Sequence, residues 1–519
     1  MIMDETADRV LKRYRAAKER RAAWETHWQE CYDYALPSRT GAVGGATPGE
    51  KKTDRLFDGT APDAVEQLAA SLLAQLTPPW AQWFGLSVGS EIAQDERGAV
   101  AEMLEKASAK LQSHFDRSNF AIEMHQCYLD LVTAGTASLL FEETAPGASS
   151  AFRFTAVPLA QVVLEESIEG RLDTTYRRSE MTLAGLRERF PNAALAPDLV
   201  AKAERDPDLR LPVLESVTPV RHSFRYLALL DQDGPGAGDL LKEGRFDHSP
   251  FLNFRWLKAP GEVYGRSPVM KALPDIKTAN KVVELVLKNA TIAVTGIWQA
   301  DDDGVLNPAN IKLVPGTIIP KAMGSAGLTP LETPGRFDVS QLMLTDLRQR
   351  IEHALLADRL GQTQNPRMTA TEVLERSAEM ARILGATFGR LQAELLTPLV
   401  IRAIAILRRR GEIPDLAIDG HLVDLQYKSP LAQQQSRQDA QNVLQWLTTA
   451  SGLGPEAAQA IDAGAAARWL GRALGVPDEL IRETPSPAGI DPAQALPGVL
   501  PAVASTLAGA ASARGGRHG

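Results

Sequence analysis

The stretch GGATPGEKKT, residues 44–53, brings glycines, lysines and a threonine together much as a phosphate-binding loop does, with Gly44 and Gly49 five positions apart. Such a loop needs its second glycine followed directly by Lys and then Ser or Thr, because the lysine and the hydroxyl meet phosphates and magnesium at a helix N-terminus. Here Glu50 precedes Lys51, and no buried strand leads into the loop. A carboxylate at that position repels phosphate. The stretch therefore indicates a solvated linker between two helices more than a nucleotide site.

Other residues that could do chemistry lack the spacing that chemistry requires. The run 323–327, MGSAG, lacks the first glycine of a serine-hydrolase elbow, and no His-Glu-x-x-His is present. The eight histidines are scattered without metal-ligand spacing. Asp301, Asp302 and Asp303 are adjacent, whereas a calcium loop alternates its acids and ends in a distal glutamate. We therefore predict no catalytic site, no bound metal and no cofactor, so that the protein is not an enzyme.

Composition narrows the class of protein further. The chain has 519 residues, 44% of them hydrophobic, which is enough for several domains, and its net charge is −8. That balance argues against a broad basic face gripping nucleic acid, although passing contact with DNA stays possible. Cys31 and Cys127 are too few for a disulfide framework and indicate a reducing compartment. The charged N-terminus does not resemble a signal peptide, and no apolar run reaches about 18 residues, so we expect a soluble protein with no membrane contact.

The elements that must position any site follow from hydrophobic periodicity. Helices are predicted at 4–35, 62–76 and 98–138. Short β-prone runs separated by turn residues then predict antiparallel sheet in 152–182 and 222–258, with a helix and a Pro/Asp-rich connection at 183–212 between them. The fold class is therefore α+β and rich in helix.

The segment 261–294 predicts a long helix with two stripes. Residues at spacings of three and four predict an apolar stripe for packing on another helix: Leu273, Ile276, Asn280, Val283, Leu287, Ala290 and Val294. A second, mostly basic stripe consists of Lys277, Lys281, Glu284 and Lys288. The second stripe is either a solvated face or a surface that contacts DNA.

After a strand- and turn-rich region to about 335, a second helix is predicted from Asp338, which can cap it, to about Leu360. Its apolar stripe consists of Leu344, Leu347, Ile351 and Ala354. The polar loop 361–368 follows. Thr369 and Glu372 then form a capping box that starts a third helix. We expect that helix to kink at Pro398 and to stop at Gly411.

Two longer segments carry a resemblance to a known family. They are GEKKTDRLFDGTAPDAVEQLAASLLAQLTPPWAQWF and GEVYGRSPVMKALPDIKTAN, followed by a helix, a β-rich insertion, a helix and a polar loop in that order. The chain from about 8 to 480 resembles the portal, or head-to-tail connecting, proteins of T7-like short-tailed bacteriophages. The tail 484–519 matches nothing and its composition predicts disorder.

The resemblance implies a portal-type ring of twelve subunits at one capsid vertex, with parts called wing, stem, clip and crown. These parts correspond here to the following residues: wing 1–265, stem helices 268–290 and 336–360, clip 291–335, tunnel loop 361–368, a long helix returning to the wing 369–429, and crown helices 430–483. The resemblance also implies partners: terminase, a tail adaptor protein, capsid and scaffolding proteins, and double-stranded DNA that passes non-specifically. The implied location is the virion, with the host cytoplasm during assembly.

Candidate DNA-channel residues come from the loop and the stem. Arg367 could contact phosphate or pair with a neighbouring subunit, and the loop's other polar residues could offer exchangeable hydrogen bonds: Gln362, Thr363, Gln364 and Asn365. The stem cations are the other candidates, because a circular assembly repeats each of them around the channel axis as a circle of positive charge. They are Lys277, Lys281, Lys288 and Arg348.

Two rival classes remain open. One is a helical oligomeric scaffold or adaptor without a DNA channel. The other is a nucleotide-dependent enzyme that uses the Gly44 loop and Lys51. The ordered series of helix, insertion, helix and loop favours the portal because neither rival requires it.

Overall fold

A computed structural model describes the following residues: 2–39, 53–89, 97–231, 238–295, 298–300, 328–330, 337–357, 385, 387–414, 423–427, 439–440, 442–447, 449 and 462–473. The chain divides into two units, Met1–Gln434 and Gln435–Gly519. The sheets, the long helices and the candidate site all belong to the first unit. The second unit contains the helix α14 (Ala463–Ala473).

The N-terminal helices lie close to the positions that hydrophobic periodicity predicts. They are α1 (Ile2–Ala35), α2 (Thr60–Leu76), α3 (Arg97–Asp116) and α4 (Phe120–Ala134). The stretch 98–138, expected to be helical throughout, is two helices and the start of a strand. Its second helix ends where Gly135 adopts a left-handed φ of 78°, a conformation that residues with a Cβ atom disfavour.

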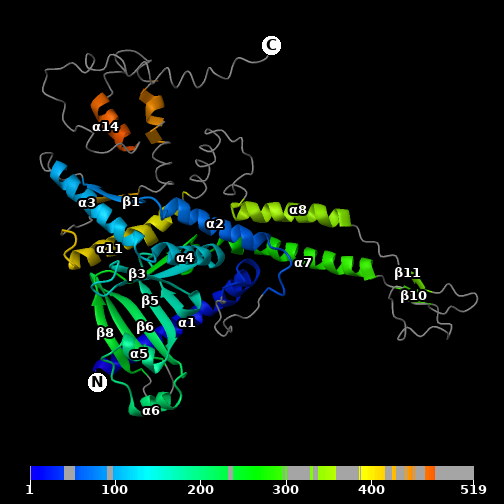
Figure 1. Ribbon diagram of the computed structural model, residues 1–519, viewed down its shortest axis with the longest axis horizontal. Coiled ribbons are helices and arrows are strands. Elements are labelled where there is room, and N and C mark those ends of the chain that lie inside the picture. The colour runs from blue at the N-terminus through cyan, green and yellow to red at the C-terminus, as the bar shows by residue number, and fades with distance from the viewer. Residues whose placement is uncertain are drawn as a thin grey trace, which may run out of the picture. The chain divides into compact units, whose positions relative to one another are not determined.

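The two larger antiparallel sheets of the first unit have three and five strands (Figure 1). The three-stranded sheet has the order β3-β2-β9, with β2 (Thr136–Glu143) between β3 (Phe152–Val157) and β9 (Phe251–Arg255). The five-stranded sheet runs in chain order through these strands: β4 (Val162–Glu165), β5 (Thr174–Met181), β6 (Leu211–Val220), β7 (Ser223–Leu230) and β8 (Leu240–Phe246). The predicted antiparallel sheet is confirmed.

Strands β2 and β6 were missed by sequence reasoning. Six successive residues of β2 are buried, and so are five of β6. A strand covered on both faces loses the alternation that identifies a half-buried strand. The expected helix between the two β regions is present as α5 (Leu183–Arg189) and α6 (Pro197–Arg205).

The α1 helix lies along the five-stranded sheet, and a second core joins the remaining helices. Ala7, Leu11, Tyr14 and Ala17 of α1 pack with buried residues of β4 to β7. The second core is rich in aromatic rings from β1 (Phe84–Val88), α3, α4, β2 and β3, whose centroids lie about 5 to 6 Å apart: Phe84, Phe115, Phe120, Phe141, Phe152 and Phe154. Strand β1 pairs with β12 (Val423–Tyr427), which brings distant parts of the chain together.

The two long helices of the candidate site are α7 (Pro268–Thr295) and α8 (Phe337–Ala354), which pack side by side (Figure 1). Helix α7 continues five residues beyond the expected end at 290, because Thr291 to Thr295 carry no helix-breaking residue. Helix α8 starts one residue before Asp338, so that residue lies inside the helix and not at its cap. Between them, the short strands β10 (Trp298–Ala300) and β11 (Leu328–Pro330) pair antiparallel.

The third predicted helix is described from 387 onward. A π-helical turn, η3 (Gln392–Leu396), directly precedes α11 (Thr397–Arg409), so the helical hydrogen bonding changes just before Pro398, while a kink there stays a prediction. Gly411 has φ of 68° just past the helix end, as expected for a glycine terminator.

Several predictions lie outside the described residues. They concern the Gly44 to Lys51 loop, most of the insertion 291–335, the loop 361–368, the capping box at Thr369 and the tail 484–519.

Candidate functional site on the paired helices

Asn280 attaches α7 to the segment that leads into α2. Its Oδ1 accepts hydrogen bonds from the backbone N–H groups of Phe57, at 2.6 Å, and Asp58, at 3.1 Å. Its Nδ2 donates to the carbonyl of Arg55 at 2.9 Å, and the side chain is only 6% exposed. A polar residue inside an apolar stripe is satisfied in one register only, so Asn280 fixes how α7 lies on the α2 segment.

Asp58 attaches the same segment to α8. Arg348 donates from Nε and Nη2 to Asp58 Oδ2 at 2.9 and 2.8 Å, and the N–H of Thr60 donates to Oδ1 at 3.0 Å. Burial acts to raise the pKa of Asp58, but the hydrogen bonds from Thr60 and Arg348 outweigh it and hold the pKa below 3.8. Residues 55–58 therefore bind both long helices at once.

A further ion pair joins the two helices directly. Arg350 Nη2 lies 3.2 Å from Asp275 Oδ1. Apolar residues of α8 also contact the rest of the molecule. Leu347 and Ile351 of its predicted stripe are 5% and 1% exposed. The base of the hairpin is thus held by both polar and apolar contacts.

Each lysine of the basic stripe of α7 has a carboxylate partner within the chain. Lys277 Nζ lies 3.1 Å from Glu30 Oε1 and over the ring of Tyr34. Lys281 and Lys288 both reach Glu284, at 2.9 and 2.6 Å. Hydrogen bonds from Lys288 and Lys281 lower the pKa of the Glu284 carboxyl, which stays charged. Of the predicted channel residues, the structure brings Lys281 and Lys288 together, turns Lys277 toward α1 and turns Arg348 toward α2.

The loop candidates Gln362, Thr363, Gln364, Asn365 and Arg367 lie outside the described residues. Sequence reasoning missed three carboxylates that partner the stem cations: Glu30, Asp58 and Asp275. No local pattern could have revealed Asp58 as the partner of Arg348, because the two residues are 290 positions apart.

The start of α7 is fixed by the motif GEVYGRSP. Tyr264 packs edge-on against Trp28, with ring centroids 4.9 Å apart, and its hydroxyl accepts from the N–H of Leu164. A Cβ on Gly265 would lie 2.1 Å from the carbonyl oxygen of Gly135, so only glycine fits there. Ser267 Oγ accepts from the N–H of Met270 at 2.9 Å and caps the helix.

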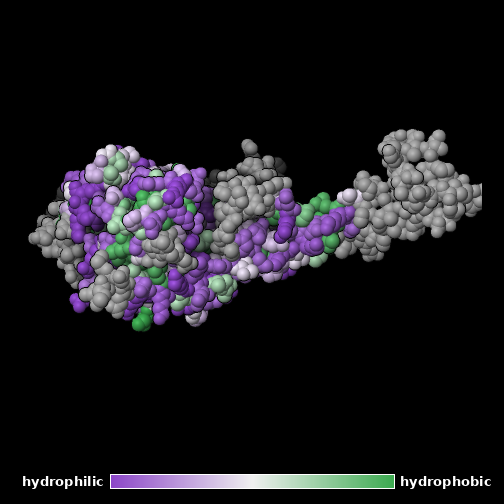
Figure 2. All heavy atoms as spheres, turned by 90° about the horizontal axis from the view of Figure 1, so that it is seen from below, coloured by the Kyte–Doolittle hydropathy of each residue, from purple (hydrophilic) through white to green (hydrophobic). Residues whose placement is uncertain are grey.

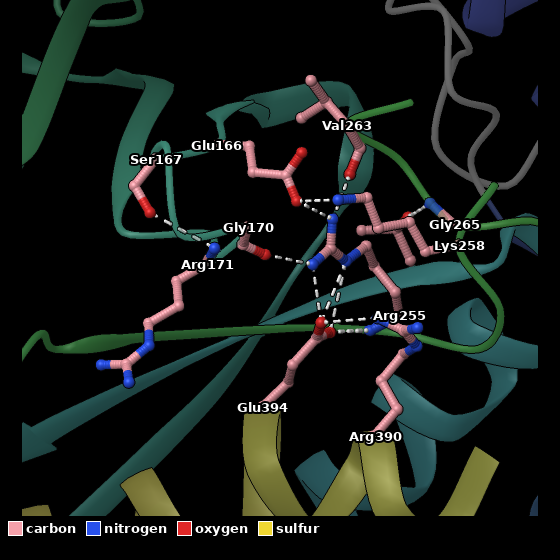
Figure 3. A network of polar contacts seen from close by, with 11 residues as sticks. Glu166, Ser167, Gly170, Arg171, Arg255, Lys258, Val263, Gly265, Arg390 and Glu394 are labelled. Carbon is pink, nitrogen blue, oxygen red and sulfur yellow. Dashed lines mark hydrogen bonds and ion pairs between the residues drawn. The ribbon is translucent and has the colours of Figure 1, made fainter. Parts of the chain in front are cut away.

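Arg255 joins the chain entering the hairpin to the chain returning from it (Figure 3). This fully buried guanidinium on β9 donates to both oxygens of Glu394 on η3, with a shortest distance of 2.6 Å, and to Glu166 at 3.0 Å. It also donates to the carbonyls of Val263 and Gly170, each at 3.0 Å. Burial acts to raise the pKa of Glu166, but hydrogen bonds from Lys258 and Arg255 lower it. The Glu166 carboxylate therefore stays charged beside Arg255.

Within the described ranges, no three His, Cys, Asp or Glu side chains gather in a way that could hold a metal ion. Cys31 and Cys127 are buried free thiols, and burial raises the pKa of Cys31 to about 12. None of the helices that the structure describes has both the length and the apolar character needed to cross a membrane.

Comparison with known proteins agrees with this architecture. A family model of bacteriophage head to tail connecting proteins matches residues 7–481. The chain therefore belongs to the bacteriophage head-to-tail connecting protein family and functions as a phage portal protein of the T7-like kind.

Three curated relatives illustrate the similarity. The chain is 28% identical over 503 residues to the probable portal protein of Bordetella phage BPP-1, covering 91% of this chain and 88% of the relative. It is 26% identical over 454 residues to the portal protein of Salmonella phage epsilon15, covering 82% and 80%. It is 22% identical over 414 residues to the portal protein of Escherichia phage T7, covering 78% and 75%.

A solved structure described as the neck of a native GTA particle, computed with C12 symmetry, covers 85% of this chain and 98% of its own chain. Its TM-score is 0.34 at 13% identity.

Proposed function

We propose that twelve copies of this protein close into a ring at one vertex of the phage capsid, where duplex DNA enters and later leaves the head. The ring is part of the virion and is assembled in the host cytoplasm. The observation that supports this most is the α7–α8 hairpin, whose base is bound through Asn280, Asp58 and Arg348 to the helices of the wing. A hairpin held at its base in this way can form one subunit's part of the wall of a ring-shaped stem.

The remaining parts follow the family's order along the chain. In this proposal the wing is 1–265, the hairpin forms the stem, and the insertion 291–335 is the clip that docks terminase and then the tail adaptor. The tunnel loop 361–368 faces DNA, with Arg367 and its polar neighbours as contacts. The segment 369–429 returns to the wing, and 430–483 forms a crown inside the head. Capsid and scaffolding proteins contact the ring from outside.

The charge distribution suits a conduit that lets DNA slide. Each phosphate held by a cation adds affinity and slows passage, so a channel wall works best when it presents few free cations. Lys277, Lys281, Lys288 and Arg348 all have carboxylate partners within the chain. Because Glu284 is shared by two lysines, each copy keeps one net positive charge there. A ring would repeat this weak positive charge around its axis, so it would guide the DNA without reading its sequence.

The protein itself performs no chemistry in this proposal, and a separate ATPase supplies the energy for packaging. The rival reading, with a nucleotide bound at the Gly44 loop, is tested by measuring ATP binding and turnover. We expect neither activity in the natural protein or in Lys51→Ala. Turnover that Lys51→Ala abolishes would favour the rival.

The proposed assembly is tested by mass photometry and negative-stain electron microscopy of the purified protein. We expect particles of about twelve chain masses, seen as rings with a bore of at least about 20 Å, wide enough for duplex DNA. A compact monomer or a closed dimer under all conditions would contradict the proposal and favour a scaffold without a channel.

A further inference from the structure

The exposed side of α1 is strongly basic in its N-terminal half. Between residues 9 and 20, eight side chains are exposed, and only Ala16 and Glu19 among them are not cations. The six cations, which we name the basic face of α1, are Arg9, Lys12, Arg13, Arg15, Lys18 and Arg20. The whole chain has a net charge of −8, so this face has the sign opposite to that of the protein.

Most of this positive charge is unpaired. Arg13 and Arg20 share the carboxylate of Glu165 at the end of β4, at 2.7 and 2.6 Å. The other four cations have no ion-pair partner among the residues that the structure describes: Arg9, Lys12, Arg15 and Lys18. The lysines of the basic stripe of α7 differ, because each of them contacts a carboxylate. The free cations therefore lie on α1 and not on that stripe.

The opposite side of α1 fixes the helix to the five-stranded sheet. Arg21 is only 4% exposed and donates to the carbonyls of Leu159, at 3.0 Å, and Val162, at 2.6 Å. Tyr14 packs against Tyr176, with ring centroids 5.7 Å apart. At a rise of about 1.5 Å per residue, the basic face is thus a row of cations about 17 Å long on a firmly held helix.

The composition of the basic face fits a phosphate backbone better than a protein partner. Between residues 7 and 39, no large hydrophobic side chain is exposed. The described surface of the first unit in Figure 2 is mostly hydrophilic, with hydrophobic residues in small patches. The core of a protein interface is apolar and depleted of charged residues, whereas binding to nucleic acid comes from cations that neutralise phosphates.

We infer that the basic face of α1 binds the phosphate backbone of duplex DNA, at a surface separate from the α7–α8 hairpin. Residues 9–20 lie on the five-stranded sheet, whereas α1 contacts α7 further along, through Glu30. The inference rests on the proposed function, which brings duplex DNA to the ring. Contacts to phosphate do not read sequence, and a ring of copies adds many weak contacts together. The hairpin would let DNA slide, and the basic face would hold it.

DNA binding by the full-length protein tests this inference. We would follow the fluorescence anisotropy of a labelled duplex of about 20 base pairs at salt concentrations from about 50 to 300 mM. The test variant carries four changes: Arg9→Gln, Lys12→Gln, Arg15→Gln and Lys18→Gln. Its affinity at the lowest salt should fall at least about tenfold. Its slope of log affinity against log salt should be flatter by about 3 to 4, because each lost phosphate contact removes about 0.9.

The matched control removes the same charges from exposed positions on other parts of the first unit. It carries Arg117→Gln, Arg153→Gln, Lys202→Gln and Lys242→Gln, and it should keep the slope of the natural protein. Arg9→Lys with Arg15→Lys preserves the charge and should also keep that slope. Both fourfold variants should keep the melting temperature of the natural protein, because the changed side chains are exposed. Lys12→Gln alone should flatten the slope by about 0.9.

Three results separate the inference from its alternatives. Equal slopes for the test variant and its matched control would overturn the inference. Poly-glutamate that displaces the duplex at equal charge concentration would favour an acidic protein partner and would also overturn it. Rings seen by microscopy, together with unchanged DNA binding in the test variant, would overturn the inference and leave the proposed function standing. A natural protein that forms no rings would contradict the proposed function itself.

Discussion

Two groups of ion pairs in this molecule differ in what surrounds them. Arg255 is completely buried and contacts Glu394, Glu166 and two backbone carbonyls (Figure 3). Glu284 on α7 holds Lys281 and Lys288 in solvent, with both lysine side chains more than 60% exposed. A buried pair must be complete for the fold to persist, whereas an exposed pair contributes little to stability. The first group therefore holds the structure, and the second sets the charge that the hairpin presents.

The same contrast divides the hairpin itself. Toward its base, Asn280, Asp58 and Arg348 have specific and partly buried partners. Beyond Asn280, the described side chains of α7 are intermediate or exposed, and their ion pairs are local. The single chain thus determines where the hairpin begins and how it is oriented.

The largest expected effect is that of Arg255→Met. It leaves Glu394 and Glu166, whose side chains are each 15% exposed, without the buried guanidinium that holds them, which should cost about 3–5 kcal/mol of unfolding free energy. Thermal and urea denaturation of the full chain measure this. Arg171→Met, which removes an exposed partner of Glu169, is the matched control and should change stability by less than about 0.5 kcal/mol. Similar losses of unfolding free energy for both variants would mean that the buried ion pairs of Arg255 stabilise the fold no more than an exposed pair does.

Asn280→Ala should have the next largest effect. It leaves two backbone N–H groups and one carbonyl near α2 without partners, at a cost of about 1–3 kcal/mol. Asn289→Ala, at an exposed position on the same helix, should be nearly neutral. Faster amide hydrogen exchange at Phe57 and Asp58 in Asn280→Ala alone is the specific sign. Unchanged exchange there would mean that Asn280 does not fix the register of α7.

Arg348→Gln should cost about 1–2 kcal/mol near neutral pH, because it removes a charge-assisted hydrogen bond to Asp58 that is half open to solvent. The folded-state pKa of Asp58 is lowered, so its contribution is present above about pH 3.8 and is lost as the pH falls further. The stability difference from the natural protein should therefore shrink below that pH. A difference that stays constant down to pH 2 would rule out the Asp58 carboxylate as the cause.

The smallest expected effect is that of Glu284→Gln, whose melting temperature should match that of the natural protein because exposed ion pairs contribute little to stability. The same change frees Lys281 and Lys288, so binding of a short DNA duplex should become tighter at low salt. For each new phosphate contact, the slope of log affinity against log salt should steepen by about 0.9. Glu102→Gln, which frees Lys106 on α3, is the control and should leave DNA binding unchanged. An equal gain in DNA affinity from both variants would mean that the hairpin contacts DNA no more than α3 does.

Sequence reasoning recovered the elements whose pattern is local. The stripe through Leu273 and Ile276 predicted α7, and Leu347 with Ile351 predicted α8, because one face of each helix is covered. It missed β2 and β6, whose buried residues do not alternate with exposed ones. Helix ends were displaced by a few residues, since tertiary contacts and not local propensity decide where fraying stops.

The candidate site was recovered only in part. Lys277 and Arg348 were found from sequence, but their partners Glu30 and Asp58 were not, and neither was the Arg350–Asp275 pair. A pairing between residues hundreds of positions apart leaves no periodic signal in a single sequence. The interpretation of Lys277 as either solvated or facing DNA could therefore not include its partner Glu30, whereas Glu284, the partner of Lys281 and Lys288, was already part of the predicted stripe.

In the function proposed above, this chain forms a DNA conduit whose wall is built from the α7–α8 hairpin. The most direct test is a cryo-electron microscopy map of the assembled protein at side-chain resolution. We predict a closed ring with α7 and α8 of every copy surrounding the bore, and with Asp58 and Arg348 paired at the base of each hairpin. A ring whose bore is lined by the sheets, with the hairpins on the outside, would contradict the account.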